Sequence, residues 1–270
     1  SARDTLLLFG GLPHQYVETW EITSDLASAS ERLGVRFQTV PQQRLRARFD
    51  APTGAEEALV VRLVADLLAG ARQHGDPMPP LTEVARAARL YVVLDGLRAK
   101  YDGDSLTMVC RPWIKDPSLP VPCVALALFQ ERGVPAACQG DLDALMTMVL
   151  YQRIGVNETF MGGAHPVANK LLLSHCALSR TLLGEDREYA MCDYHGRKGS
   201  PTLRISVPRG ETVTLARLTQ DLETLLLATG TVLGQAENAA VCTNAVLLEL
   251  DQRHQVLDAV KGPQQHYVMA

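Results

Sequence analysis

Apolar and polar positions alternate in two different ways along the 270-residue chain. In the first half, short apolar runs are separated by longer segments in which apolar residues recur at helical spacing. Strands that alternate with helices of about 10–15 residues are typical of parallel βαβ units, so this half predicts a doubly wound parallel sheet. We expect strands over 5–11, 35–40, 106–110, 134–138 and 158–162, and helices over 24–34, 53–75, 80–103, 123–133 and 141–155, two of them capped by Ser24 and Thr82.

The second half consists of short strand-like runs joined by turns that carry Gly, Pro or Asp. This pattern predicts an antiparallel sheet or a small barrel beside the α/β part. We therefore expect an α/β domain over 1–169 and a β-rich domain over 170–270 that completes the site. The expected strands are 171–176, 187–192, 201–208, 211–219, 223–234, 242–250 and 266–270, with a helix near 251–260.

Composition narrows the class of protein. Hydrophobic residues make up 47% of the chain and charged residues 21%, as in soluble globular proteins. The net charge of −4 and the absence of a basic run argue against a nucleic-acid partner. No segment approaches the roughly 18 apolar residues of a membrane span, and the first residues lack the features of a signal peptide. We expect a cytoplasmic protein with no membrane partner.

The six cysteines include no CxxC pair and lie in apolar surroundings. A zinc knuckle or a thioredoxin-type site is therefore not expected, and the pattern favours buried, reduced thiols. The six are Cys110, Cys123, Cys138, Cys176, Cys192 and Cys242.

Three polar segments follow predicted parallel strands, at the edge where such sheets bind ligands. They supply, in chain order, Arg111 with Trp113, Gln139 with Asp141, and Gly162 and Gly163 with His165. Asp141 also fits a helix cap, because it opens a helix. Trp113 fits a packing lid as well as a ligand platform.

Four histidines are candidates for chemistry. His175 ends a strand and His266 begins one, so each fits either a hydrogen-bonded core residue or a ligand. His165 lies in an expected loop, which suits a functional side chain. His195 is expected to be an exposed turn residue.

Several segments in the same order and spacing resemble the L-fucose isomerase and L-arabinose isomerase superfamily. They are MVCRPW (108–113), LPVPCVALALFQERGVPAACQGDLDALMTMVL (119–150), ETFMGGAHP (158–166), NKLLLSHCALSRTLLG (169–184) and GRKGSPTLRISVPRGETVTLARL (196–218). The similarity spans about residues 85–234. It implies an aldose–ketose isomerase of a deoxy sugar or pentose, a divalent metal such as Mn²⁺, and a homo-oligomer, a trimer or hexamer.

The resemblance implies two acids and a histidine as metal ligands, and this chain departs from that set. Gln139 stands at the first acid position, and Met161-Gly162-Gly163 at the second. His175 and His266 fall at or near metal-binding histidines of the family. A carboxamide is a poorer Mn²⁺ ligand than a carboxylate and cannot shuttle a proton. Asp141, Glu158 or His165 is then expected to substitute.

Three hypotheses follow. The first is a sugar isomerase-like enzyme with His175, His266 and His165 on the metal, Gln139, Asp141 and Glu158 in catalysis, and Arg111, Trp113, Gly162 and Gly163 on the substrate. The second is a non-catalytic relative that binds a sugar or acts as a structural or regulatory subunit. The third is a different enzyme that uses Cys138 or Cys176 with a nearby histidine as nucleophile and base.

Overall fold

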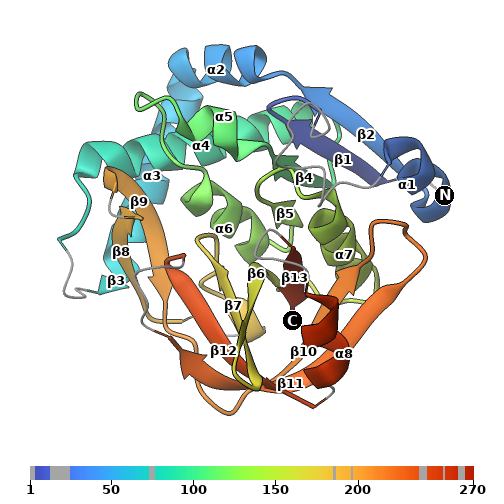
Figure 1. The fold of residues 1–270 in the computed structure, drawn as a ribbon. Helices are drawn as coiled ribbons and strands as arrows, with labels where there is room; N and C mark the ends of the chain where they lie inside the picture. The colour runs from blue at the N-terminus through green and yellow to red at the C-terminus, as the bar shows by residue number, and fades with distance from the viewer. Residues whose placement is uncertain are drawn as a thin grey trace.

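A parallel sheet packed with helices and a closed antiparallel barrel make up the fold (Figure 1). The structure is a computed structural model that describes residues 4–12, 25–72, 77–184, 187–195, 197–236, 242–251, 253–260 and 265–270. The predicted fold class, a parallel α/β sheet followed by a barrel-like antiparallel part, is therefore confirmed.

The parallel sheet has the order β2-β1-β4-β5. Its strands are β1 (Asp4–Phe9), β2 (Val35–Val40), β4 (Ser105–Met108) and β5 (Ala136–Ala137). Leu6, Leu7, Leu8 and Phe9 of β1 are all fully buried. A run of consecutive buried apolar residues is expected of a strand covered on both faces, so β1 forms the centre of this core.

Seven helices are described in the α/β part. They are α1 (Leu26–Leu33), α2 (Gln42–Asp50), α3 (Gly54–Gly70), α4 (Leu81–Lys100), α5 (Cys110–Ile114), α6 (Cys123–Glu131) and α7 (Leu142–Arg153). No helix among the described residues is long and apolar enough to span a membrane.

The predicted helix starts need correction. Thr82 lies inside the first turn of α4, which begins after Pro80, so it is not the cap. The cap of α1 is Asp25, whose carboxylate accepts the N–H of Ser28 at 2.8 Å. Ser24 lies outside the described residues.

Six antiparallel strands close the barrel in the order β10-β11-β12-β7-β6-β13, with β13 pairing back to β10. They are β6 (Phe160–Val167), β7 (Lys170–His175), β10 (Thr212–Leu218), β11 (Leu225–Gln235), β12 (Asn244–Leu250) and β13 (His266–Met269). The helix α8 (Arg253–Ala259) precedes β13. A separate three-stranded sheet consists of β3 (Ala71–Arg72), β8 (Tyr189–Tyr194) and β9 (Arg197–Ile205).

The segment 158–162, predicted to be a parallel strand, belongs to the barrel instead. Its residues continue as β6 to Val167 and pair with β7 and β13. Gly162, Gly163 and His165 therefore lie inside an antiparallel strand, and the prediction that they form a loop is wrong. Their backbone groups pair with those of β7 and β13, so these three residues are held in place by the barrel.

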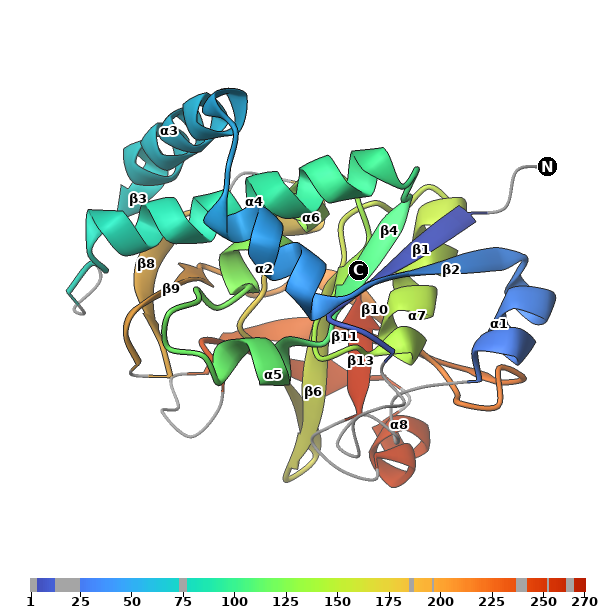
Figure 2. The same ribbon diagram turned by 90° about the horizontal axis from the view of Figure 1, so that it is seen from above.

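The helix α7 joins the two parts of the molecule, because it packs on β4 and β5 on one side and on β10 and β13 on the other (Figure 2). Its Thr147 hydroxyl accepts the N–H of Leu218 at 3.0 Å. Its Asp143 forms a buried ion pair with Arg217 at 3.2 Å. The start of α7 is thereby held at a fixed position against the barrel.

Candidate functional site

Gln139 occupies a strained turn between β5 and α7. Its φ of 60° and the 71° of Gly140 are left-handed. A non-glycine residue in this region costs about 1–2 kcal/mol, so the surrounding structure must hold it there. The N–H of Gly140 donates to the carbonyl of Met108 at 2.9 Å. The side-chain Oε1 of Gln139 is buried and has no hydrogen-bond partner among the described residues.

Asp141 caps α7 and also contacts His266, the first residue of β13. Its Oδ1 accepts the N–H of Ala144 at 2.7 Å, and its Oδ2 lies 2.7 Å from Nδ1 of His266. Both side chains are buried, Asp141 fully. Because a carboxylate only accepts, Nδ1 of His266 carries a proton, and in the neutral form of the ring Nε2 is left with a lone pair. Asp141 can therefore cap α7 with one carboxylate oxygen and orient His266 with the other.

His175 has the opposite tautomer. Its Nδ1 accepts the backbone N–H of Ala177 at 3.1 Å, so in the neutral ring Nε2 carries the proton. Burial, followed by the neighbouring His266, lowers the pKa of His175 to about 4. The two rings meet edge to face with 5.4 Å between their centroids. One imidazole therefore offers an acceptor nitrogen and its neighbour a donor.

His165 lies in β6 with its Nε2 3.1 Å from Oγ of Ser174. Burial, and then the charge of His266, lowers the pKa of His165. In the register of β6 and β13, Gly163 stands opposite His266. A Cβ on Gly162 would come within 2.7 Å of Cγ of Leu173, so a glycine is required there for close strand packing.

The remaining predicted residues, Trp113, Arg111 and Glu158, lie outside the three strands that carry the histidines. Trp113 is buried in α5, donates to the carbonyl of Pro120 at 2.8 Å and packs edge-on against Phe49, as in the packing alternative. Arg111 is partly buried on the same helix. Glu158 precedes β6 by two residues, at the end of the strand away from Gly163.

A small cavity of about 30 Å³ connects Gln139 with His175. Most of its other walls are cysteines, which come from separate parts of the chain. The lining residues are Cys110, Ile114, Pro122, Cys123, Cys138, Gln139, His175, Cys176, Tyr194 and Cys242. Five of the six thiols of the protein thus surround one space.

The cysteines are reduced, and all except half-buried Cys242 are buried, as predicted. The sequence did not indicate that they gather. Sγ of Cys110 lies 3.3 Å from Sγ of Cys138. Sγ of Cys176 lies 3.3 Å from Nε2 of His195, the exposed turn residue.

Cys176, His195 and Cys242 form a group that could hold a metal ion, since their ligand atoms all lie within 4.8 Å of one another. Hydrogen bonds from Cys123, then from Cys242 and His195, lower the pKa of the Cys176 thiol. The hydrogen bond to Cys176 raises the pKa of His195. The arrangement favours a thiolate beside an imidazolium. The predicted trio His165, His175 and His266 is not within this group.

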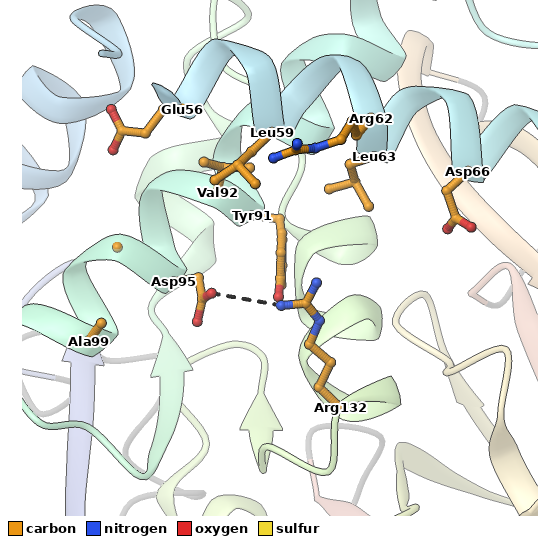
Figure 3. Close-up of a pocket in the computed structure, with 11 residues that line it drawn as sticks. Glu56, Leu59, Arg62, Leu63, Asp66, Tyr91, Val92, Asp95, Ala99 and Arg132 are labelled. Carbon is orange, nitrogen blue, oxygen red and sulfur yellow. Dashed lines mark ion pairs between the residues drawn. The ribbon is translucent and has the colours of Figure 1, made fainter. Parts of the chain in front are cut away.

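A second, larger cavity of about 570 Å³ lies between α3 and α4 (Figure 3). Its charged side chains are largely paired. Asp95 faces Arg132 at 3.9 Å, and Glu56 is bound by Arg48 from outside the cavity at 2.5 Å. None of the candidate residues from the sequence lines it.

No family model matches this sequence, and no curated protein matches it at a significant level. The resemblance to sugar isomerases consequently stays a prediction. The gathering of the five thiols had no signal in the sequence, because they come from distant parts of the chain and share no short spacing. The histidine pair did have a signal in the sequence, because His175 ends one predicted strand and His266 begins another.

Proposed function

We propose that this protein is an aldose–ketose isomerase-like enzyme in which histidines carry the proton transfer. The single observation behind the proposal is the pair His175 and His266 with opposite tautomers, 5.4 Å apart and oriented by Asp141. A base next to a hydrogen-bond donor is what moves a proton between carbons beside a carbonyl group.

In this proposal Nε2 of His266 removes the proton from the carbon next to the substrate carbonyl. The Nε2–H of His175 donates to the carbonyl oxygen and stabilises the negative charge that develops on it. The buried Oε1 of Gln139 accepts the neighbouring hydroxyl of the substrate. The protonated His266 then returns its proton to the former carbonyl carbon. His175 gives its Nε2 proton to the carbonyl oxygen and takes the proton of the neighbouring hydroxyl, which becomes the new carbonyl group.

The residues present do not fit Mn²⁺. Manganese takes carboxylate, carbonyl and imidazole ligands, and a histidine binds a metal through an unprotonated nitrogen. Nε2 of His175 is protonated in the tautomer set by Ala177, and both oxygens of Asp141 are already engaged. We therefore assign no step to manganese.

Of the proposed groups, Gln139 and His175 line the small cavity, and its size limits how a sugar could reach them. Pockets for small molecules usually start at about 300 Å³, ten times the space beside His175. Only the carbonyl end of the substrate would enter this space. The remainder of the sugar would lie outside it.

Solvent exchange tests the proposal. The protein is incubated in D₂O with L-fucose, L-arabinose and other pentoses and deoxy sugars, and the hydrogen on C2 is followed by proton NMR. We expect its signal to decay equally with EDTA and with added Mn²⁺. His266→Gln should slow the decay by about 10²-fold or more, which is a typical contribution of a general base.

Tyr267→Phe is the matched control. It changes the neighbouring residue on β13, whose buried hydroxyl has no partner among the described residues. Exchange should continue at the wild-type rate in this variant. Exchange that stops with EDTA would exclude the histidine mechanism, and sugar binding without any exchange would leave the non-catalytic alternative.

A further inference from the structure

We propose that Cys176, Cys242 and His195 bind a zinc ion, with Cys123 as the fourth ligand. The site borders the same small cavity as His175 but uses other residues, and it does not depend on the proposed isomerase activity. It lies where β7 ends at His175, where β12 is about to begin, and in the turn between β8 and β9.

The distances suit a tetrahedral ion. With Zn–S near 2.3 Å and Zn–N near 2.0 Å, a sulfur and a nitrogen ligand lie about 3.5 Å apart. Sγ of Cys176 and Nε2 of His195 are 3.3 Å apart, and Sγ of Cys242 completes a triangle with no side above 4.8 Å. The Cys176–His195 pair thus already has the spacing of two zinc ligands, and Cys242 lies close enough to reach the same ion by a movement of its side chain.

Cys123 is the nearest candidate for the fourth ligand because it lines the same cavity as Cys176 and Cys242, although its thiol lies outside the group whose ligand atoms are all within 4.8 Å and would have to move toward the ion. Its thiol is buried, as is that of Cys176. Cys123 and Cys176 also belong to one buried apolar cluster with Val121, against which Cys242 packs. A Cys₃His set with no open position is typical of a structural zinc site.

The donor atoms decide which metal is bound. Thiolates are soft ligands that select zinc, Cu(I) or iron–sulfur clusters over magnesium, calcium or manganese. A tetrahedral set with one imidazole is typical of zinc. Thr243 supports the cluster, since its hydroxyl donates to Sγ of Cys176 at 3.7 Å.

The first experiment measures zinc in the purified 270-residue chain. We expect one zinc per chain after gel filtration, and an affinity that falls at least 10²-fold in Cys176→Ser, Cys242→Ser and His195→Ala. Replacement of the zinc by Co²⁺ should give the intense visible bands of a tetrahedral thiolate site, and these bands should weaken in Cys123→Ser.

Cys192→Ser is the matched control, a buried cysteine whose thiol lies 3.4 Å from the hydroxyl of Thr202. It should keep the full metal content. Alkylation with iodoacetamide, read by mass spectrometry on the wild-type protein, does not depend on how well the variants fold. Added zinc should protect Cys176 and Cys242 from alkylation.

Three results would overturn the proposal. The first is purified protein that neither contains zinc nor takes it up. The second is a Cys176→Ser variant that folds and binds zinc as tightly as the wild type. The third is a metal-free Cys176 thiol that reacts rapidly and is not protected by zinc, which would instead favour a nucleophilic cysteine paired with His195.

Discussion

The bond between Asp141 and His266 ties the start of α7 to the last strand of the barrel, so its removal has a measurable cost. Asp141→Asn keeps the cap on Ala144, because Asn and Asp are equally good capping residues. It replaces an acceptor that faces Nδ1 of His266 with a neutral amide. The hydrogen bond to a buried charged group is worth about 1.5–3 kcal/mol, and we expect the free energy of unfolding to fall by that amount.

Asp141→Ala removes the cap as well. A lost cap costs about 1 kcal/mol, so this variant should be about 2.5–4 kcal/mol less stable than the wild type. The difference in free energy of unfolding between the two variants is then the contribution of the helix cap. Urea denaturation measures both values, provided that circular dichroism and fluorescence give coincident transitions.

The tautomer of His266 is the second measurement. Long-range ¹⁵N–¹H correlation spectra distinguish Nδ1–H from Nε2–H in each imidazole. In the wild type we expect Nδ1–H for His266, and in Asp141→Asn a shift toward Nε2–H. The reasoning fails if Asp141→Asn is within about 0.5 kcal/mol of the wild type, the usual range of neutral surface changes, or if the tautomer is unchanged.

Two further predictions concern packing and pH. Gly162→Ala should lower the free energy of unfolding by about 1–3 kcal/mol, because its Cβ would lie 2.7 Å from Cγ of Leu173 and 3.0 Å from N of Ser174. Gly54→Ala, where a Cβ meets nothing within 4 Å, is its control in the same urea assay, and an equal loss in both would contradict the argument. Burial raises the pKa of Tyr91 to about 12, whereas in the unfolded chain the pKa is near 10. As pH rises from 10 to 12 the unfolded chain therefore loses the phenol proton first, and the free energy of unfolding falls. The Tyr91→Phe variant lacks this loss, so its free energy of unfolding should rise by on the order of 3 kcal/mol relative to that of the wild type across that window. Parallel plots of the free energy of unfolding against pH for the two proteins would contradict the assignment.

Most strands and the long helices could be predicted from periodicity, because burial on one face or on both leaves a regular pattern. The helix α2 was not predicted, because only two of its nine residues, Leu45 and Phe49, are buried and they leave no clear periodic pattern. The strand β6 was placed in the wrong sheet. A short apolar run identifies a strand without identifying its partner, and the glycines that let β6 pack against Leu173 looked like a turn.

The candidate site was predictable in part. Gln139, Asp141 and His175 sit at element ends, and that position is visible in the sequence. The contact between Asp141 and His266 depends on barrel closure, which no local pattern specifies. The same holds for Cys176 and His195, whose contact depends on the path of β8 and β9.

The four residues of β13 fill the gap between β10 and β6, and the same strand delivers His266 to Asp141. Strands leave the ribosome in sequence order, so nascent chains shorter than this point expose two unpaired edges. Such edges recruit other strands and promote aggregation. The contact between Asp141 and His266 and the protection of both edges against self-association are therefore established by the same strand.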